Sequence, residues 1–117
     1  MSLLRKFITI LLHFKGIKVV DAWFENRQKE LHLLVRPHKN GCLCPSCGRR
    51  CKVIKKTVKE RVWRDIPLGF VSVFLHYAPR EIKCIIHGRI QEEVPWAAPY
   101  SRETYRFEYL MRILQKS

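Results

Sequence analysis

Two short turns are the part of this sequence whose residue types and spacing suit a chemical role. One reads Cys44-Pro-Ser-Cys47-Gly48 and the other reads Cys84-Ile-Ile-His87-Gly88. A gap of two residues lets both ligands of one tight turn reach a single Zn²⁺, and the glycine allows the positive φ that such a turn commonly needs. We therefore predict one structural zinc ion in a closed site, with no open position to activate water, held by Cys44, Cys47, Cys84 and His87.

Two further cysteines are alternatives for one of these four ligands. Cys42 and Cys51 both lie close enough to the first turn to replace a ligand. Free or buried core cysteines are the weaker interpretation, because two such turns, each followed by glycine, rarely arise by chance. A redox Cys-x-x-Cys is also disfavoured, since no βαβ pattern surrounds it. The remaining histidines lack ligand spacing and are predicted to be surface or hydrogen-bonded residues: His13, His32, His38 and His76.

The charge of the chain indicates a polyanionic partner. Its 117 residues hold 23 Lys and Arg against 10 Asp and Glu, a formal net charge of +13. Such an excess attracts nucleic acid first and an anionic membrane surface second. The cations gather around both turns and at the start of a C-terminal helix. We predict nucleic-acid contacts from Arg49, Arg50, Lys52, Lys55, Lys56, Lys59, Arg61, Arg64, Arg80, Lys83, Arg89, Arg102 and Arg106.

Catalysis and membrane insertion are poorly supported. The chain has only two aspartates, Asp21 and Asp65, whereas a metal-dependent nuclease needs several converging carboxylates. It also lacks a P-loop and a nucleophile elbow, so we expect no catalytic residues and no small-molecule substrate. The apolar run at residues 7–12 is too short to span a bilayer, and no cleavage site follows it. With cysteines at metal-ligand spacing, the sequence predicts a cytoplasmic protein with reduced thiols.

The elements that must position the two turns follow from hydrophobic periodicity. Helical spacing predicts an N-terminal helix over residues 2–16, and a C-terminal helix capped by Ser101 with an apolar face of Phe107, Leu110, Met111 and Leu114. Strand-like segments are expected at 17–25, 31–36, 52–66, 70–77, 81–84 and 90–94. The fold class is thus α+β, a small zinc-pinned, mostly antiparallel and zinc-ribbon-like β core with a helix at each end.

Three segments are expected, packed as one compact unit. They are a helix and β-hairpin over 1–40, a zinc-binding β domain over 41–100, and the C-terminal amphipathic helix over 101–117, which ends without a stop signal and suggests a truncated continuation.

Four motifs occur in a specific order: Cys44-Pro-Ser-Cys-Gly48, Arg64-Asp-Ile-Pro-Leu68, Cys84-Ile-Ile-His-Gly88 and Ala98-Pro-Tyr-Ser-Arg102. This order resembles the N-terminal zinc-finger region of ISL-three family insertion-sequence transposases, in which many members carry cysteine where His87 stands. The resemblance implies recognition of double-stranded DNA at transposon ends, the terminal inverted repeats. Family members continue into a helix-turn-helix and an acidic catalytic domain, so the chain is expected to lack catalysis alone and, in bacteria, to associate with the nucleoid when DNA-bound.

Two other function classes remain open. A zinc-ribbon RNA-binding or ribosome-associated protein would use the same basic surface, and it would prefer structured RNA over inverted-repeat DNA. A protein-interaction module would self-associate through its terminal helices and would bind nucleic acid only weakly.

Overall fold

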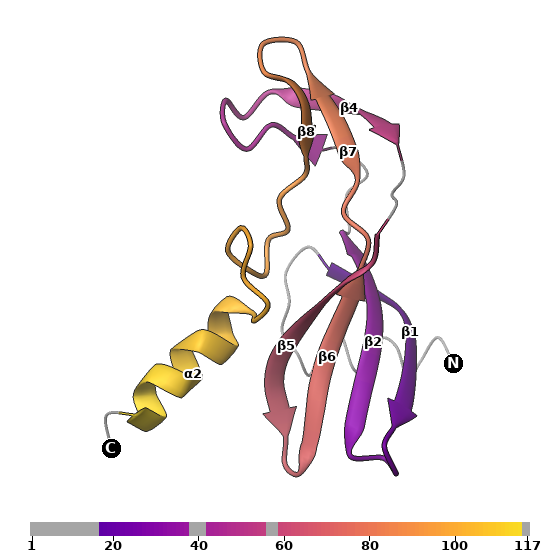
Figure 1. Cartoon of the computed structure of the whole chain (residues 1–117), viewed down its shortest axis with the longest axis vertical. Coiled ribbons are helices and arrows are strands. Elements are labelled where there is room, and N and C mark those ends of the chain that lie inside the picture. The colour runs from indigo at the N-terminus through magenta and orange to yellow at the C-terminus, as the bar shows by residue number, and fades with distance from the viewer. Residues whose placement is uncertain (1–16, 38–41, 56–58, 116–117) are drawn as a thin grey trace.

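The computed structural model of the chain describes residues 17–37, 42–55 and 59–115. It is an elongated molecule of 46 × 39 × 23 Å with a radius of gyration of 15.5 Å (Figure 1). The predicted N-terminal helix over residues 2–16 lies outside the described residues. The elements are β1 (Ile17–Glu25), β2 (Glu30–Pro37), β3 (Cys42–Leu43), β4 (Arg50–Lys55), β5 (Arg61–Leu68), β6 (Val71–Tyr77), β7 (Glu81–Cys84), β8 (Gly88–Gln91) and α2 (Tyr105–Gln115).

The strands make two four-stranded sheets, one above the other in Figure 1. We call β1-β2-β6-β5 the lower sheet and β3-β4-β7-β8 the zinc sheet. All strand pairs are antiparallel except β2 and β6, which run parallel. These two strands are not consecutive, because the chain forms β3, β4 and β5 between them. The described residues are therefore mostly β-sheet with one helix. This agrees with the predicted β core followed by a C-terminal helix.

Two predicted strands differ from the structure by more than one residue at an end. The segment 52–66 is not one strand, because β4 pairs in the zinc sheet and β5 in the lower sheet, so the chain crosses between sheets within it. The strand expected at 90–94 ends instead at Gln91. At the next residue the Glu92 backbone N–H still donates to the Arg80 carbonyl at 3.0 Å, but the Arg80 N–H donates to the Glu92 carboxylate at 2.8 Å.

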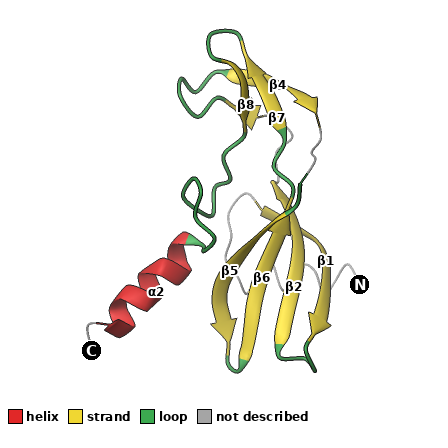
Figure 2. Ribbon diagram, viewed as in Figure 1, coloured by secondary structure: helices red, strands yellow, loops and turns green. Residues whose placement is uncertain are grey.

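The main core lies against one face of the lower sheet. Alternation along β2 buries Leu31, Leu33 and Val35 on that face, in keeping with the period of two of a half-buried strand. The long loop between β8 and α2, drawn green in Figure 2, returns to this core and inserts Trp96. Trp63 of β5 is fully buried and meets Trp96 edge to face, with ring centroids 5.3 Å apart. Trp63 is therefore a core residue.

Glu92 ties the chain that leaves the zinc sheet to the end of the lower sheet. Its carboxylate accepts hydrogen bonds from the Tyr77 hydroxyl, from the Arg80 backbone N–H at 2.8 Å, and from Arg80 Nε at 2.9 Å. Burial works against ionisation of this carboxyl, but the Arg80 guanidinium and the Tyr77 hydroxyl outweigh it and lower the pKa of Glu92 below its ordinary value. Burial and the nearby carboxylate raise the pKa of Tyr77, so the phenol stays a donor.

Glu92→Gln is expected to destabilise the fold by about 3 kcal/mol at pH 7, the usual cost of removing one partner from a buried ion pair. A lowered folded-state pKa means that the carboxylate's contribution is complete above the ordinary value of 4.5 and is lost as the pH falls through the folded value. Urea unfolding of wild type and variant should therefore differ most near pH 7 and converge progressively below pH 4.5, with zinc content followed in the same samples. A difference that persists unchanged at low pH would contradict this role of the carboxylate.

The C-terminal helix begins later than predicted. Thr104, not Ser101, is its cap, since Thr104 Oγ1 accepts a hydrogen bond from the Phe107 backbone N–H at 3.3 Å. Ser101 instead lies in the preceding turn, with its hydroxyl 2.8 Å from Glu108 Oε1. α2 contacts β5, and of the predicted apolar face Phe107 is buried while Leu114 is exposed.

Candidate metal centre

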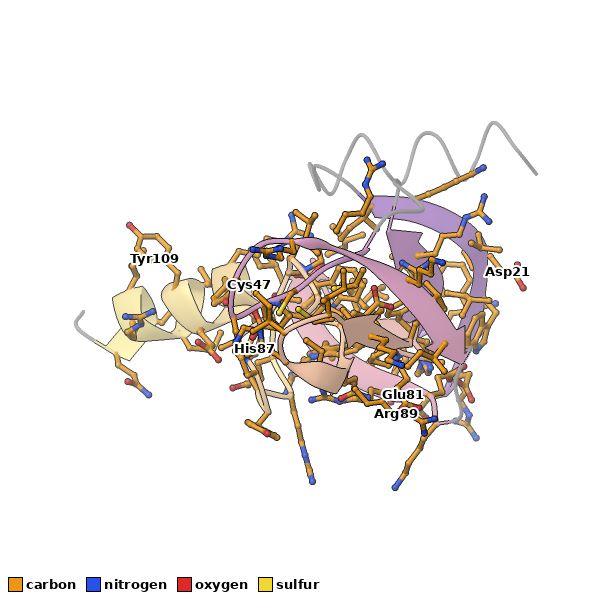
Figure 3. All side chains as sticks on the ribbon, turned by 90° about the horizontal axis from the view of Figure 1, so that it is seen from above. Asp21, Cys47, Glu81, His87, Arg89 and Tyr109 are labelled. Carbon is orange, nitrogen blue, oxygen red and sulfur yellow. The ribbon has the colours of Figure 1, made fainter. Side chains whose placement is uncertain are left out.

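Cys44, Cys47, Cys84 and His87 converge at one end of the zinc sheet. Their four ligand atoms all lie within 4.8 Å of one another. His87 Nδ1 is 3.5 Å from Cys44 Sγ and 3.6 Å from Cys84 Sγ, and the Cys47 and Cys84 sulfurs are 3.6 Å apart. Figure 3 shows Cys47 and His87 next to each other, seen from above the zinc sheet. The structure thus brings together all four residues that the sequence singled out.

These distances suit a tetrahedral zinc ion. With Zn–S bonds of about 2.3 Å and Zn–N bonds of about 2.0–2.1 Å, a tetrahedron has S–N edges of about 3.6 Å and S–S edges of about 3.8 Å. The observed separations fall within a few tenths of an ångström of those edges. Three thiolates and one imidazole also form one of the standard closed donor sets for structural zinc. The chain therefore has a site for one structural Zn²⁺.

Two glycines shape the turns that carry the ligands. Gly48 has φ 74° and Gly88 has φ 73°, both in the left-handed region that a side chain at these positions would strain. The first turn is closed by hydrogen bonds from Gly48 N–H to Cys44 C=O and from Cys44 N–H to Arg49 C=O, each 2.8 Å long. The second turn connects β7 to β8, whose ladder pairs Cys84 with Gly88. Hydrogen bonds and strand pairing therefore fix the backbone of both turns, and with it the positions of the cysteine and histidine side chains.

Two of the three thiols, Cys44 and Cys84, favour the thiolate even before a metal is considered. A backbone hydrogen bond from His87, joined by its imidazole, lowers the pKa of Cys84 to about 6 in spite of burial. Burial opposes ionisation of Cys44 as well, yet backbone hydrogen bonds at Cys47 and Ser46 leave its pKa below the ordinary value. A backbone hydrogen bond at Arg49 works the same way at Cys47, but burial and the Cys84 and Cys44 sulfurs outweigh it and raise the pKa of Cys47. The Cys84 and Cys44 sulfurs raise the pKa of His87 in return. Deprotonated sulfur is the form that binds zinc, so the turn geometry suits the ligand state.

Cys51 lies beside the metal centre but outside its ligand group. Its thiol is buried against Ile82 and Cys84 and donates to the Arg49 carbonyl at 3.4 Å. Burial raises the pKa of this thiol above its ordinary value, which favours the neutral form. Cys42 pairs with Cys51 through the β3–β4 backbone, and its part in ligation stays a prediction.

The opposite face of the zinc sheet is cationic. Cross-strand pairing sets Lys52 of β4 opposite Lys83 of β7, and Lys83 opposite Arg89 of β8. Arg50 precedes Lys52 by two residues and so shares its face. All four side chains are exposed, and no ion pair joins any of them to a carboxylate within the described ranges. We call Arg50, Lys52, Lys83 and Arg89 the cationic face.

Other predicted nucleic-acid contacts are placed differently. The Arg80 guanidinium binds buried Glu92, and Arg106 binds the fully buried Asp65 with Nη2 2.5 Å from Oδ2. Arg61 lies over the Trp63 ring at 4.9 Å and Arg64 over Phe107 at 5.1 Å. Arg49, Lys59 and Arg102 are exposed outside the cationic face, Lys55 contributes its backbone to β4, and Lys56 lies outside the described residues.

The sequence did not reveal the partner of Asp65. Asp65 Oδ1 accepts hydrogen bonds from the Thr104 hydroxyl at 2.9 Å and from Arg106 Nε at 2.8 Å. It therefore joins β5 to the first turn of α2. The partners lie about forty positions apart in the sequence, so no local pattern predicts this contact.

Comparison with known proteins identifies the region around the first turn. A family model described as the zinc-finger of transposase IS204/IS1001/IS1096/IS1165 matches residues 41–85. The chain is 32% identical over 104 residues to the transposase for insertion sequence element IS1001 of Bordetella parapertussis, covering 87% of this chain and 25% of that protein. It is 34% identical over 65 residues to the transposase for IS1557 of Mycobacterium tuberculosis (strain H37Rv), covering 56% of this chain and 15% of that protein.

The chain spans a quarter or less of the length of these curated relatives. No solved structure matches it significantly. Within the described residues, no helix has the length and apolar character needed to cross a membrane.

Proposed function

Because residues 41–85 are a zinc-finger region of the ISL-three transposase type, we propose that this zinc-binding domain recognises double-stranded DNA at transposon ends. The terminal inverted repeats are the proposed target. Cys44, Cys47, Cys84 and His87 are the proposed ligands of a zinc ion that acts as a scaffold. The role assigned to the chain is recognition rather than catalysis, and DNA binding would bring it to the bacterial nucleoid.

The observation that carries this proposal is the row formed by Lys52, Lys83 and Arg89. Like charges directly opposite each other on neighbouring strands destabilise a sheet, and here three stand side by side across β4, β7 and β8. A polyanion relieves that repulsion, and each neutralised phosphate also releases condensed counterions. The row would therefore lie along a DNA backbone, fixing the register in which other side chains read bases.

The proposed zinc site and a small core lie on the other side of the strands that carry this row. The strands that carry the row turn their other faces to Cys51, Ile82 and Cys84, a core too small to hold a sheet unaided. Because the zinc joins the β3–β4 turn to the β7–β8 turn, it would hold the three charged strands at one spacing. Removal of the metal is then expected to abolish DNA binding through loss of the sheet.

The triple variant Lys52→Gln/Lys83→Gln/Arg89→Gln is expected to bind inverted-repeat DNA at least tenfold more weakly. If each cation meets one phosphate, the slope of log K against log salt should become shallower by about 2.7. The matched control, Arg27→Gln/Lys29→Gln/Arg112→Gln, removes the same charge from exposed positions outside the zinc sheet that have no like charge paired opposite them. Fluorescence anisotropy over a range of salt concentrations measures both the affinity and its salt dependence. An equal loss of affinity in the two variants would contradict a specific role of the cationic face in DNA binding.

The same titration separates the other function classes. Structured RNA that competes better than inverted-repeat duplex would favour an RNA-binding protein that uses the same cationic face. Self-association is a second candidate activity, favoured by the exposed aromatic side chain of Tyr109, which points away from the body of the molecule in Figure 3. Sedimentation at several protein concentrations, with wild type and Tyr109→Ser, tests it.

A further inference from the structure

A second cluster of metal-ligating side chains lies on the lower sheet, on the face opposite the main core. His32 of β2 is buried between the rings of Trp23 and Phe74, with centroids 5.6 Å and 5.0 Å away. Its Nε2 atom points at two carboxylates, 2.9 Å from Glu25 Oε2 and 3.0 Å from Glu30 Oε1. The sequence offered no ligand spacing for His32, because strand pairing rather than a short turn brings these residues together.

The other nitrogen of His32 belongs to a chain of hydrogen bonds. His32 Nδ1 is 2.7 Å from His76 Nε2, and His76 Nδ1 is 2.8 Å from Glu60 Oε1. A carboxylate only accepts, so His76 Nδ1 carries a proton and, in the neutral ring, His76 Nε2 does not. The same rule asks for a proton on His32 Nε2, so two neutral rings, with one proton each, are one proton short of the three contacts in this chain. When the Glu60 end carries its proton, His32 Nδ1 donates to His76 Nε2 and a lone pair lies on His32 Nε2, the atom that faces Glu25 and Glu30.

A lone pair and two carboxylate oxygens at hydrogen-bond distance repel one another unless a cation lies between them. Glu25 and Glu30 are also directly opposite each other in the β1–β2 ladder, where like charges destabilise a sheet. The Trp23 indole N–H donates to Glu25 Oε2 at 3.1 Å. The contacts still leave one positive charge to be supplied, by a proton or by a metal ion, at a point reached by one imidazole nitrogen and two carboxylates. From this we propose that Glu25, Glu30 and His32 bind a divalent transition-metal ion, separate from the structural zinc.

The distances indicate which geometry the ion would take. A six-coordinate ion with ligands at about 2.1 Å has neighbouring ligands about 3.0 Å apart, against about 3.3 Å for a tetrahedral one. The two separations of 2.9 Å and 3.0 Å fit the former. They are also ordinary N–H···O hydrogen-bond lengths, so the experiment has to separate a metal ion from a proton. One imidazole with two carboxylates suits ions of intermediate hardness such as Mn²⁺, Fe²⁺, Ni²⁺ or Zn²⁺, with water in the remaining positions. The hydrogen bond to His76 is the outer contact that orients a metal-bound imidazole.

The test uses the full chain loaded with its structural zinc and titrated with Ni²⁺, which favours six ligands. Calorimetry should give one Ni²⁺ per chain, with native mass spectrometry showing that the zinc is retained. Tryptophan fluorescence should be partly quenched, because Trp23 stacks on His32. Glu25→Gln and Glu30→Gln should each weaken Ni²⁺ binding at least tenfold and remove the quenching, whereas the matched variant Glu93→Gln, exposed and outside the cluster, should not.

Three results would overturn the proposal. One is a Ni²⁺ isotherm that Glu30→Gln leaves unchanged in a variant with wild-type circular dichroism and zinc content. Another is Ni²⁺ that replaces the zinc instead of adding to it. The last is a ¹⁵N spectrum in which both nitrogens of His32 stay protonated at saturating Ni²⁺, because a proton would then supply the missing charge.

Discussion

Cys47→Ser protein is expected to purify without stoichiometric zinc and without an ordered zinc sheet. Cys47 is exposed, so its replacement removes a proposed metal ligand while costing little packing. Structural zinc contributes about 10–16 kcal/mol in small zinc fingers at neutral pH, far more than the few apolar side chains of this sheet can replace. Metal analysis together with hydrogen exchange of β4, β7 and β8 measures the loss, and the lower sheet should keep its protection.

Cys51→Ser is the matched control for that variant. Cys51 is buried against the same small core but lies outside the ligand group, so the substitution changes packing and leaves ligation intact. We expect full zinc content and a loss of stability of about 1 kcal/mol. If Cys51→Ser lost its metal while Cys47→Ser kept it, the proposed ligand set would have to be replaced by one containing Cys51.

Asp65→Asn is expected to detach α2 from the lower sheet at a cost of about 4 kcal/mol. The Asp65 carboxylate is fully buried and holds both the Arg106 guanidinium and the Thr104 hydroxyl. An amide cannot accept the paired hydrogen bonds of Arg106, which leaves a partly buried cation without its counter-charge. Urea unfolding gives the stability, and hydrogen exchange along residues 105–115 shows whether α2 opens before the sheet.

Asp21→Asn provides the comparison, since it makes the same chemical change at an exposed position of β1. Its effect should stay within about 0.5 kcal/mol. If both variants lost equal stability, the Asp65–Arg106 pair would not be the contact that holds the helix.

The metal centre was predictable because its signal is local. Each turn contributes two ligands at fixed spacing and a glycine with φ near 73° or 74°, and these features can be read from five consecutive residues. Strand β1 was also predicted with its observed bounds, because Val, Trp and Phe dominate residues 17–25. Such predictions need no knowledge of what the segment packs against.

The parts that the sequence did not reveal depend on contacts between distant segments. The parallel pairing of β2 with β6 follows from the return of the chain to the lower sheet after β3 and β4, which no short pattern encodes. Ser101 and Thr104 are both capping residues by type, with serine the slightly better one, and the Thr104 contact to Asp65 decides between them. Charge alone could not separate Arg106, which binds Asp65, from Arg89, which belongs to the cationic face.

The most direct test of the central claim is DNA affinity as a function of bound zinc. Anisotropy of a labelled inverted-repeat duplex should be measured with zinc-loaded protein, after removal of zinc by a strong chelator, and after zinc is restored. Zinc-loaded protein should bind and prefer the repeat over a shuffled duplex, chelated protein should lose binding, and added zinc should recover it. Affinity that is unchanged by removal of the metal would contradict a zinc-held DNA-binding face.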